Sequence, residues 1–452
     1  MVFHPRDPQY RRLSRRDFLR KSLVTGAALP SAAAILAACS SDDPPASGTG
    51  NGDVGGDPGV PRFGTPDNPA TLPLWDDVQP IASDLEPEAG PLVIYNWEQY
   101  IWKQVLDDFS EKYDVEWRYK TFYNMEEAIQ KIQTGQVEFD VFFPTIDAVP
   151  KMAAAKQLQP LNKDYIANFT NIWPDLQDPF YDGGAQYTVP YTIYHTGIAW
   201  RTDLVDKEPE DLAAMENPYD IFWDPTYAGK TGIYDDYREA MALAMLRNEG
   251  ADVDVNTTDP AIIERAKQSL LELNSTMDIR ATIDGTYAGI PEGKFGLHQA
   301  WSGDIQAGPW YVGDKEEAAL LRYYWPARDG FGGTIGNDTM AIPTSAKNPV
   351  LAHLFLDFML EEFNGIKNWT WVGYQVPFNV VDPDTIFEES YPGLEGWFSW
   401  DYKGHWENLK PTIVTPEDFA IGKRAVGLPL DVDLMYQEAY NEFAGGAGGE
   451  EE

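Results

Sequence analysis

Phe295-Gly296-Leu297-His298-Gln299-Ala300-Trp301-Ser302-Gly303-Asp304 is the stretch around which we organise the chain. Its first residues predict a strand that ends at Trp301, and the Ser-Gly-Asp that follows can open a helix. In open α/β sheets, ligands bind where strands end. A tryptophan ring attracts a cation through its quadrupole, and a carboxylate attracts it through its charge. The alternative is structural, because Ser302 also suits a helix N-cap and Trp301 a core.

Strand-like and helix-like segments alternate along the chain. Strand patterns fall at 92–97, 115–122, 139–143, 187–200, 231–234, 295–301 and 338–343. Helical periodicity falls at 101–113, 125–132, 149–155, 236–248, 260–273 and 350–360. This order predicts an α/β fold with a mainly parallel sheet and helices on both faces. A chain of 452 residues is too long for one simple core, which predicts two lobes with extensions.

The composition narrows the classes of partner. Acidic residues number 72 against 34 basic ones, a formal net charge of -38. Such a chain repels nucleic acid and anionic lipid and attracts cations, although solubility or adaptation to salt also explains an acidic surface. The single cysteine excludes intramolecular disulfides. The five histidines lack metal-binding spacing and no phosphate-binding glycine motif is present, so we expect no metal and no other cofactor.

The start of the chain predicts export and lipid attachment. Ser14-Arg15-Arg16-Asp17-Phe18-Leu19-Arg20 precedes an apolar run at 27–38 and resembles a twin-arginine signal. Leu36-Ala37-Ala38-Cys39 resembles a lipoprotein box, in which cleavage precedes the cysteine and the cysteine is acylated. We therefore expect residues 1–38 to be removed and Cys39 to anchor the chain to the outer face of the cytoplasmic membrane. Residues 39–89 are expected to form a flexible tether, and 446–452 a disordered tail.

Six motifs over residues 90–380 resemble the polyamine-binding proteins of ABC importers, the spermidine/putrescine type. They are Tyr95-Asn96-Trp97-Glu98-Gln99-Tyr100, Phe143-Pro144-Thr145, Asp235-Asp236-Tyr237-Arg238-Glu239, Trp301-Ser302-Gly303-Asp304, Asp338 with Ala341-Ile342-Pro343, and Gly373-Tyr374 with Pro377 and Asn379. The resemblance implies a type II periplasmic-binding-protein fold, with two α/β lobes joined by a multi-strand hinge and a ligand cleft between them. Lobe one would comprise 90–199 plus 338–381, and lobe two 200–337 plus 382–445.

The same resemblance implies a binding protein without enzymatic activity, acting as a monomer that hands a polyamine to a permease. It gives ligand-binding roles to Trp97, Tyr100, Thr145, Asp236, Glu239, Trp301, Asp304, Asp338 and Tyr374. The two tryptophans would form walls, and the two tyrosines a rim or a hydrogen-bond donor. Glu239, Asp304 and Asp338 would pair with amines, and Thr145 would add a hydroxyl contact. Asp236 would be a second carboxylate one helical turn from Glu239. Each role has a structural alternative. Asp236 and Glu239 fit a capping box, Asp338 fits a turn at a strand end, and Tyr100 and Tyr374 fit a core.

Two positions depart from the motifs of that family. Asp147 stands where one branch has a tyrosine, and Gly336 stands where a bulky aromatic is expected two residues before Asp338. The cleft is therefore expected to lose a wall and gain a carboxylate. The aromatic region 397–406 has no counterpart in the family. A sugar-binding protein of the same fold and an exported glycoside hydrolase remain alternatives, since tryptophans and carboxylates also suit sugars.

Overall fold

The computed structural model describes residues 59–123, 125–312, 315–379, 382–387 and 406–446. The predicted signal at 1–38, the predicted lipid site Cys39, residues 447–452 of the predicted tail and residues 397–405 lie outside this part. None of the helices in the described ranges is both long and apolar enough to span a membrane.

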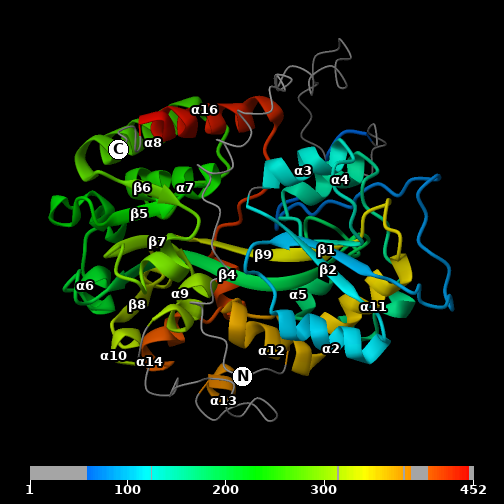
Figure 1. The fold of residues 1–452 in the computed structure, drawn as a ribbon. Helices are drawn as coiled ribbons and strands as arrows, with labels where there is room; N and C mark the ends of the chain where they lie inside the picture. The colour runs from blue at the N-terminus through cyan, green and yellow to red at the C-terminus, as the bar shows by residue number, and fades with distance from the viewer. Residues whose placement is uncertain (1–58, 124, 313–314, 380–381, 388–405, 447–452) are drawn as a thin grey trace, which may run out of the picture. The chain divides into compact units, whose positions relative to one another are not determined.

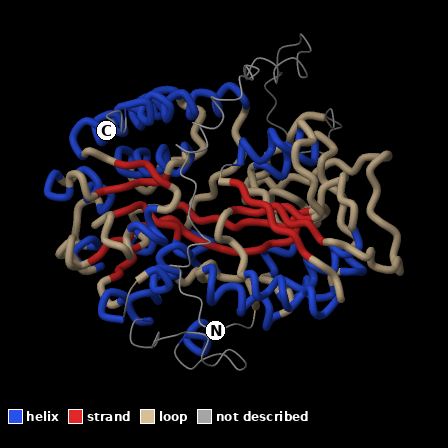
Figure 2. Tube along the Cα trace, viewed as in Figure 1, coloured by secondary structure: helices blue, strands red, loops and turns tan. Residues whose placement is uncertain are grey.

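One nine-stranded sheet runs through the described part of the chain (Figure 2). Its order is β2-β1-β3-β9-β4-β7-β5-β6, with β8 paired to β4. The strands are β1 (Leu92–Trp97), β2 (Trp117–Phe122), β3 (Val141–Phe142), β4 (Thr188–Arg201), β5 (Thr231–Tyr234), β6 (Arg280–Thr282), β7 (Leu297–Trp301), β8 (Leu321–Tyr324) and β9 (Thr334–Ala341).

The prediction of a mainly parallel sheet is wrong for the middle of this sheet. Pairing is parallel at both ends, between β1 and its neighbours β2 and β3, and between β5 and its neighbours β6 and β7. In the middle, β4 runs antiparallel to β9, β7 and β8. The sequence patterns locate strands but carry no information on their direction, and the antiparallel pairs join segments distant in sequence.

Strand β4 connects the two halves of the sheet. Its first part, from Thr188 to Thr196, pairs with β9, and its last part, from Thr196 to Trp200, pairs with β7. Nearly all its residues are buried, as expected for an aromatic and β-branched run covered on both faces. A bulge lies between Pro190 and Thr192, where proline has no N–H to give to the ladder.

Helices cover both faces of the β1–β2 end (Figure 1). On one side lie α2 (Lys103–Tyr113), α11 (Pro349–Met359) and α12 (Glu362–Val372), and on the other α3 (Met125–Gln133) and α4 (Ala148–Ala154). The α2 stripe of Val105, Leu106 and Phe109 is buried, as its 3.6-residue period requires. Phe109 meets Phe355 of α11 edge-on, with ring centroids 5.2 Å apart.

A second hydrophobic core lies at the β5–β7 end. Helices α7 (Tyr237–Glu249), α8 (Pro260–Met277) and α16 (Leu430–Gly446) pack together there (Figure 1). Met241, Leu270 and Tyr436 bring one buried side chain each from these three helices. The remaining α-helices are short: α5 (Pro174–Gln177), α6 (Pro209–Ala213), α9 (Ser302–Ala307), α10 (Lys315–Ala318), α13 (Pro383–Phe387), α14 (Trp406–Leu409) and α15 (Pro416–Ile421).

The prediction of a flexible tether is wrong for residues 59–89, which are held against the folded chain. Leu72 is 2% exposed, and the indole of Trp75 donates to the Ala153 carbonyl at 2.9 Å. Lys156 pairs with Asp77 at 2.8 Å. The composition is rich in turn-forming residues, but two well-placed apolar side chains are enough to fix an irregular segment once a surface exists to receive them.

Candidate functional site

A cavity of about 210 Å³ lies at the carboxyl ends of β1, β3, β5 and β7. All nine candidate residues line it, from both halves of the sheet. Trp97 ends β1 and Trp301 ends β7, whereas Thr145 follows β3, Asp236 and Glu239 follow β5, and Asp304 follows β7. Ligands of open α/β sheets bind at the carboxyl ends of strands. Here the strands of the two halves run in opposite directions and their carboxyl ends converge near Thr196 of β4, which brings together residues more than 200 positions apart.

Asp304 lies in a deep corner of the cavity, with 5% of its surface exposed. The Tyr374 hydroxyl donates to Oδ1 at 2.6 Å, and the Tyr234 hydroxyl donates to Oδ2 at 2.8 Å. Burial raises the pKa of Asp304 to about 7, against the opposing effect of the two hydrogen bonds. The N-cap alternative for Ser302 is wrong, because Trp301 holds the N-cap position and Ser302 is the first residue of α9.

Trp301 and Glu239 form one unit beside this corner. The Trp301 indole donates to Glu239 Oε1 at 2.8 Å, and its ring stacks on Tyr234 with centroids 3.9 Å apart. The Thr196 hydroxyl also donates to Oε1, at 3.1 Å. Burial, followed by the charge of Asp236, raises the pKa of Glu239 to about 7. Trp301 is half-buried and lines the cavity, so its side chain is not enclosed in a hydrophobic core.

Asp236 is the N-cap of α7. Its carboxylate accepts from the backbone N–H of Arg238 at 2.9 Å and of Glu239 at 3.0 Å. The capping alternative is thus confirmed for Asp236, although the residue also lines the cavity. Glu239 does not complete the capping box, because its side chain is bonded to Trp301 and Thr196 instead.

Asp338 occupies a second corner, on the other half of the sheet. It lies inside β9, so the turn alternative is wrong. The Tyr100 hydroxyl donates to Oδ2 at 2.7 Å, and burial raises the pKa of Asp338 to about 6. Tyr100 and Tyr374 meet edge-on, with centroids 4.9 Å apart. Both tyrosines are buried, as the core alternative expected, yet both line the cavity through contacts with its carboxylates.

The remaining two candidates lie on the β1–β3 side. The Trp97 indole donates to the Phe143 carbonyl at 3.2 Å, and the half-buried ring tilts against Phe122 at 4.7 Å. Thr145 joins Asp338 through an isolated backbone bridge. A ligand contact of the Thr145 hydroxyl stays a prediction.

Sequence patterns missed two tyrosines of the site, Tyr194 and Tyr234. Tyr234 ends a short apolar strand, a pattern that indicates core, and it orients both Asp304 and the Trp301 backbone N–H, the latter at 2.7 Å. Tyr194 lies in β4 directly opposite Gly336 of β9. The wall predicted to be lost at Gly336 is therefore replaced from the neighbouring strand, which only the pairing register reveals.

The charges of the lining residues are strongly one-sided. Seven are acidic: Glu98, Asp147, Asp235, Asp236, Glu239, Asp304 and Asp338. Arg238 is the only Lys or Arg among these described lining residues, and its guanidinium donates to the Val426 carbonyl and to Asn256. Carboxylates with raised pKa values and aromatic rings make this a cavity for an organic cation.

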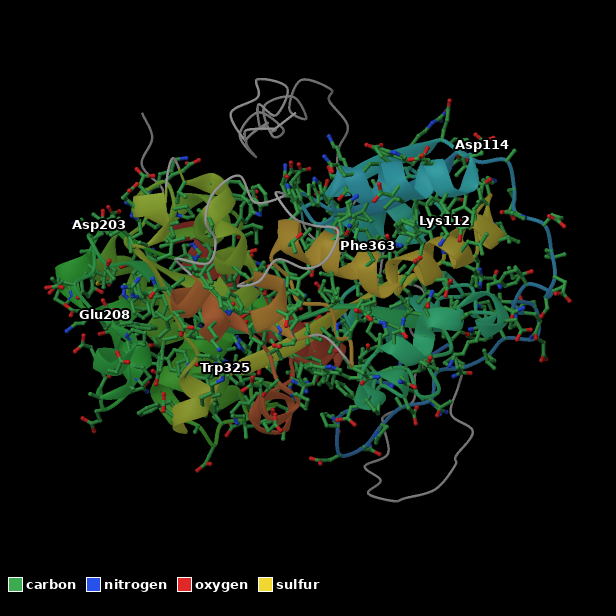
Figure 3. All side chains as sticks on the ribbon, turned by 90° about the horizontal axis from the view of Figure 1, so that it is seen from below. Lys112, Asp114, Asp203, Glu208, Trp325 and Phe363 are labelled. Carbon is green, nitrogen blue, oxygen red and sulfur yellow. The ribbon has the colours of Figure 1, made fainter. Side chains whose placement is uncertain are left out.

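Basic residues elsewhere form ion pairs away from the cavity lining. Lys112 pairs with Glu361 at 3.0 Å, Arg322 with Glu208 at 2.6 Å, and Arg201 with Asp203 at 3.0 Å. Figure 3 shows Lys112 on one side of the described part, and Asp203 and Glu208 on the opposite side. Lys151 is the exception, because its ammonium lies 3.9 Å from the lining carboxylate of Asp147. Among the described residues, Glu239, Asp304 and Asp338 are bonded to neutral groups and have no ion-pair partner.

Comparisons with known proteins agree with this geometry. The spermidine/putrescine-binding periplasmic protein of Salmonella typhimurium is 28% identical over 327 residues, 70% of this chain and 86% of that protein. The putrescine/cadaverine-binding protein of Pseudomonas aeruginosa is 27% identical over 299 residues, 64% of this chain and 80% of that protein. The structure of a spermidine/putrescine ABC transporter substrate-binding protein from Streptococcus pneumoniae aligns with a TM-score of 0.57 at 23% identity, covering 79% of this chain and 99% of that one.

The match to a family model covers most of the candidate residues that line the cavity. The model of bacterial extracellular solute-binding proteins matches residues 104–393, which contain seven of the nine candidate residues. The match in fold confirms the predicted two-lobed periplasmic-binding-protein-like fold. The bounds of the two lobes stay a prediction. With more than half of its length matched, the chain belongs to the bacterial extracellular solute-binding protein family.

Proposed function

We propose that this protein binds a linear polyamine of the putrescine or spermidine type and delivers it to an ABC import permease. The observation that carries the proposal is the charge of the cavity. Seven of its lining residues are acidic, and the guanidinium of Arg238, the one Arg or Lys among the described lining residues, donates hydrogen bonds to Val426 and Asn256. A polyamine is an apolar rod that carries ammonium groups. It requires carboxylates for its nitrogens and aromatic faces for its methylenes, and the cavity offers both.

The electrostatics of the cavity support a cationic ligand. Burial raises the pKa of Asp304, Glu239 and Asp338, which means that their ionised forms are costly without a counter-charge. An entering ammonium group supplies that charge. The relatives named for spermidine, putrescine and cadaverine support the same class of ligand, and the structural relative named as part of an ABC transporter supports the permease.

Titration calorimetry of the purified protein with putrescine, spermidine and maltose tests the proposal. We expect a single site for a polyamine and no heat from maltose. Binding of maltose alone would favour the sugar-binding alternative, and release of sugar from a glycoside would favour the hydrolase.

The rate of association with spermidine should fall as salt is added, because screening shortens the reach of the electric field of the protein to about 10 Å at 0.1 M. A rate that stays flat would contradict cation recognition.

We also propose that the exported protein is held at the membrane through Cys39 and acts as a monomer. The signal-like sequence before Cys39 supports the anchor, and the residue lies outside the described part of the chain. Cys39→Ser should move the protein from the detergent phase to the aqueous phase in a partition assay. A variant that stays with membranes after a salt wash would contradict lipid attachment. Light scattering of the released variant gives the oligomeric state.

A further inference from the structure

Tyr194 and Gly336 face each other in the wall of the cavity. They are paired in the antiparallel register of β4 and β9, and both line the cavity. A Cβ atom added to Gly336 would lie 3.1 Å from both the hydroxyl oxygen and Cζ of Tyr194. That separation is tighter than an ordinary carbon contact, so the Tyr194 ring occupies the space that a side chain at position 336 would need. The wall depends on both residues.

Neighbouring rings fix the position of Tyr194. Its ring meets Trp301 and Tyr374 edge-on, with centroids 6.2 and 5.9 Å away. Within the part of the chain that the structure describes, its hydroxyl has no hydrogen-bond partner. The side chain is half-buried and lines the cavity.

The Tyr194 hydroxyl lies within electrostatic reach of carboxylates on both sides of the cavity. Burial raises its pKa first, and the charges of Asp338, Glu239, Asp236 and Asp147 raise the pKa further. The phenol therefore stays protonated at neutral pH. Its oxygen can accept a hydrogen bond from an ammonium N–H, at a point between the carboxylates that attract the ends of a polycation.

We propose that Tyr194 selects polyamines that carry a protonated amine within the chain, as spermidine does, over diamines that have only methylenes there. This inference rests on the proposed function and specifies its ligand. An internal ammonium group gives the hydroxyl a partner. A methylene group at the position of the internal amine displaces water from the hydroxyl but cannot form a hydrogen bond with it. A ligand that leaves a buried polar group without a hydrogen bond binds more weakly.

The test compares spermidine with 1,8-diaminooctane, a diamine of the same length in which a methylene replaces the internal amine. Spermidine carries more charge, so a preference of the wild type alone is not informative, and the change in the ratio is the readout. Tyr194→Phe keeps the ring and removes the hydroxyl. We expect calorimetry to show about a tenfold loss of spermidine affinity and no loss for the diamine. Equal losses for both ligands, or no loss for either, would overturn the inference.

Gly336→Ala provides a second route to the same answer. It should weaken spermidine binding in the wild type by displacing Tyr194, and should add no further loss when Tyr194→Ala is already present. Additive losses would contradict a shared wall. Tyr113→Phe on α2, outside the cavity lining, is the matched control and should leave both ligands unaffected.

These outcomes separate the two proposals. A wild-type protein that binds neither spermidine nor putrescine contradicts the proposed function. A wild-type protein that binds spermidine, with a ratio to 1,8-diaminooctane that Tyr194→Phe does not change, contradicts only the role of Tyr194. Thermal melting of each variant shows that the fold is kept.

Discussion

The corners around Asp304 and Asp338 share one design and differ in one respect. In both, a buried carboxylate accepts a hydrogen bond from a tyrosine, and the two tyrosines pack edge-on. Asp304 has a phenol on each oxygen, whereas Asp338 has one on Oδ2 only, among the described residues. The phenols are neutral, so neither corner has a counter-charge from the residues that the structure describes. The difference implies that Asp338 offers an oxygen to a ligand, while Asp304 acts mainly through its charge.

The largest effect is therefore expected for Asp338→Asn. Removing one partner of a desolvated charge pair costs about 2–5 kcal/mol, on the order of 30- to several-thousand-fold in affinity. Calorimetry with spermidine measures this loss, and Asp203→Asn, in a peripheral ion pair, is the control. A loss no greater than that of Asp304→Asn would break the distinction between the two corners.

The next effect in size is the dependence on pH, which acts on both corners. The pKa values of Asp304 and Glu239 are raised to about 7 and that of Asp338 to about 6, so all three carboxyls are mostly neutral at pH 5. Spermidine keeps its charge over this range. Affinity should therefore rise from pH 5 to pH 8 by more than about tenfold, with release of protons on binding below pH 7. Calorimetry in two buffers of different ionisation enthalpy counts those protons, and a flat profile would contradict the raised pKa values.

Asp304→Asn is expected to lower affinity by only about tenfold, ~1.4 kcal/mol, because the oxygens of Asp304 already accept hydrogen bonds from two phenols.

Asp304→Asn should also change the stability of the ligand-free protein, by an amount that depends on pH. Since the folded-state pKa is raised, the folded protein binds more protons than the unfolded chain between about pH 4 and 7, and stability falls as pH rises through that window. The variant should thus melt higher than the wild type at pH 8 and lose that advantage at pH 5. A melting difference that does not vary with pH would show that the charge of Asp304 is not the cause.

The smallest effect is expected for Trp97→Leu. The ring offers one face to the cavity from the Asp338 side, worth about 0.5–1 kcal/mol or two- to fivefold in affinity for a partly exposed contact. Trp301→Leu should cost more and also lower the melting temperature, because Trp301 holds Glu239 and stacks on Tyr234. Equal losses for the two tryptophans would show that these extra contacts of Trp301 do not matter for binding.

Local patterns predicted the elements well where a segment carries a complete strand or helix pattern of its own. β5 lies at 231–234 as predicted, and α7 and α11 begin and end within one residue of their predicted ranges. β9 begins at Thr334, four residues before its predicted start, because a glycine-rich stretch indicates a loop until β4 is present to pair with it. The same reason explains the ordered segment at 59–89, whose partners are more than 70 residues away.

The site shows the same limit. Motif positions identified nine residues that do line one cavity, but they did not distinguish how each is used. Asp236 uses Oδ1 to cap α7, whereas both oxygens of Asp304 accept hydrogen bonds from phenols. Tyr194 and Tyr234 carry no local signal, since a tyrosine in a buried strand is the ordinary composition of a core. Their importance follows from register and packing, which require the folded chain.

The long strand β4 both lines the cavity and joins the two halves of the sheet. Thr196 is the residue at which β4 passes from β9 to β7, and Tyr194 and Thr196 both line the cavity. A ligand seated against these side chains would also restrain the backbone of β4 where it passes from one half of the sheet to the other. Amide hydrogen exchange at these two residues should consequently slow on binding, and changes at Tyr194 should alter the residence time of the ligand as well as its affinity.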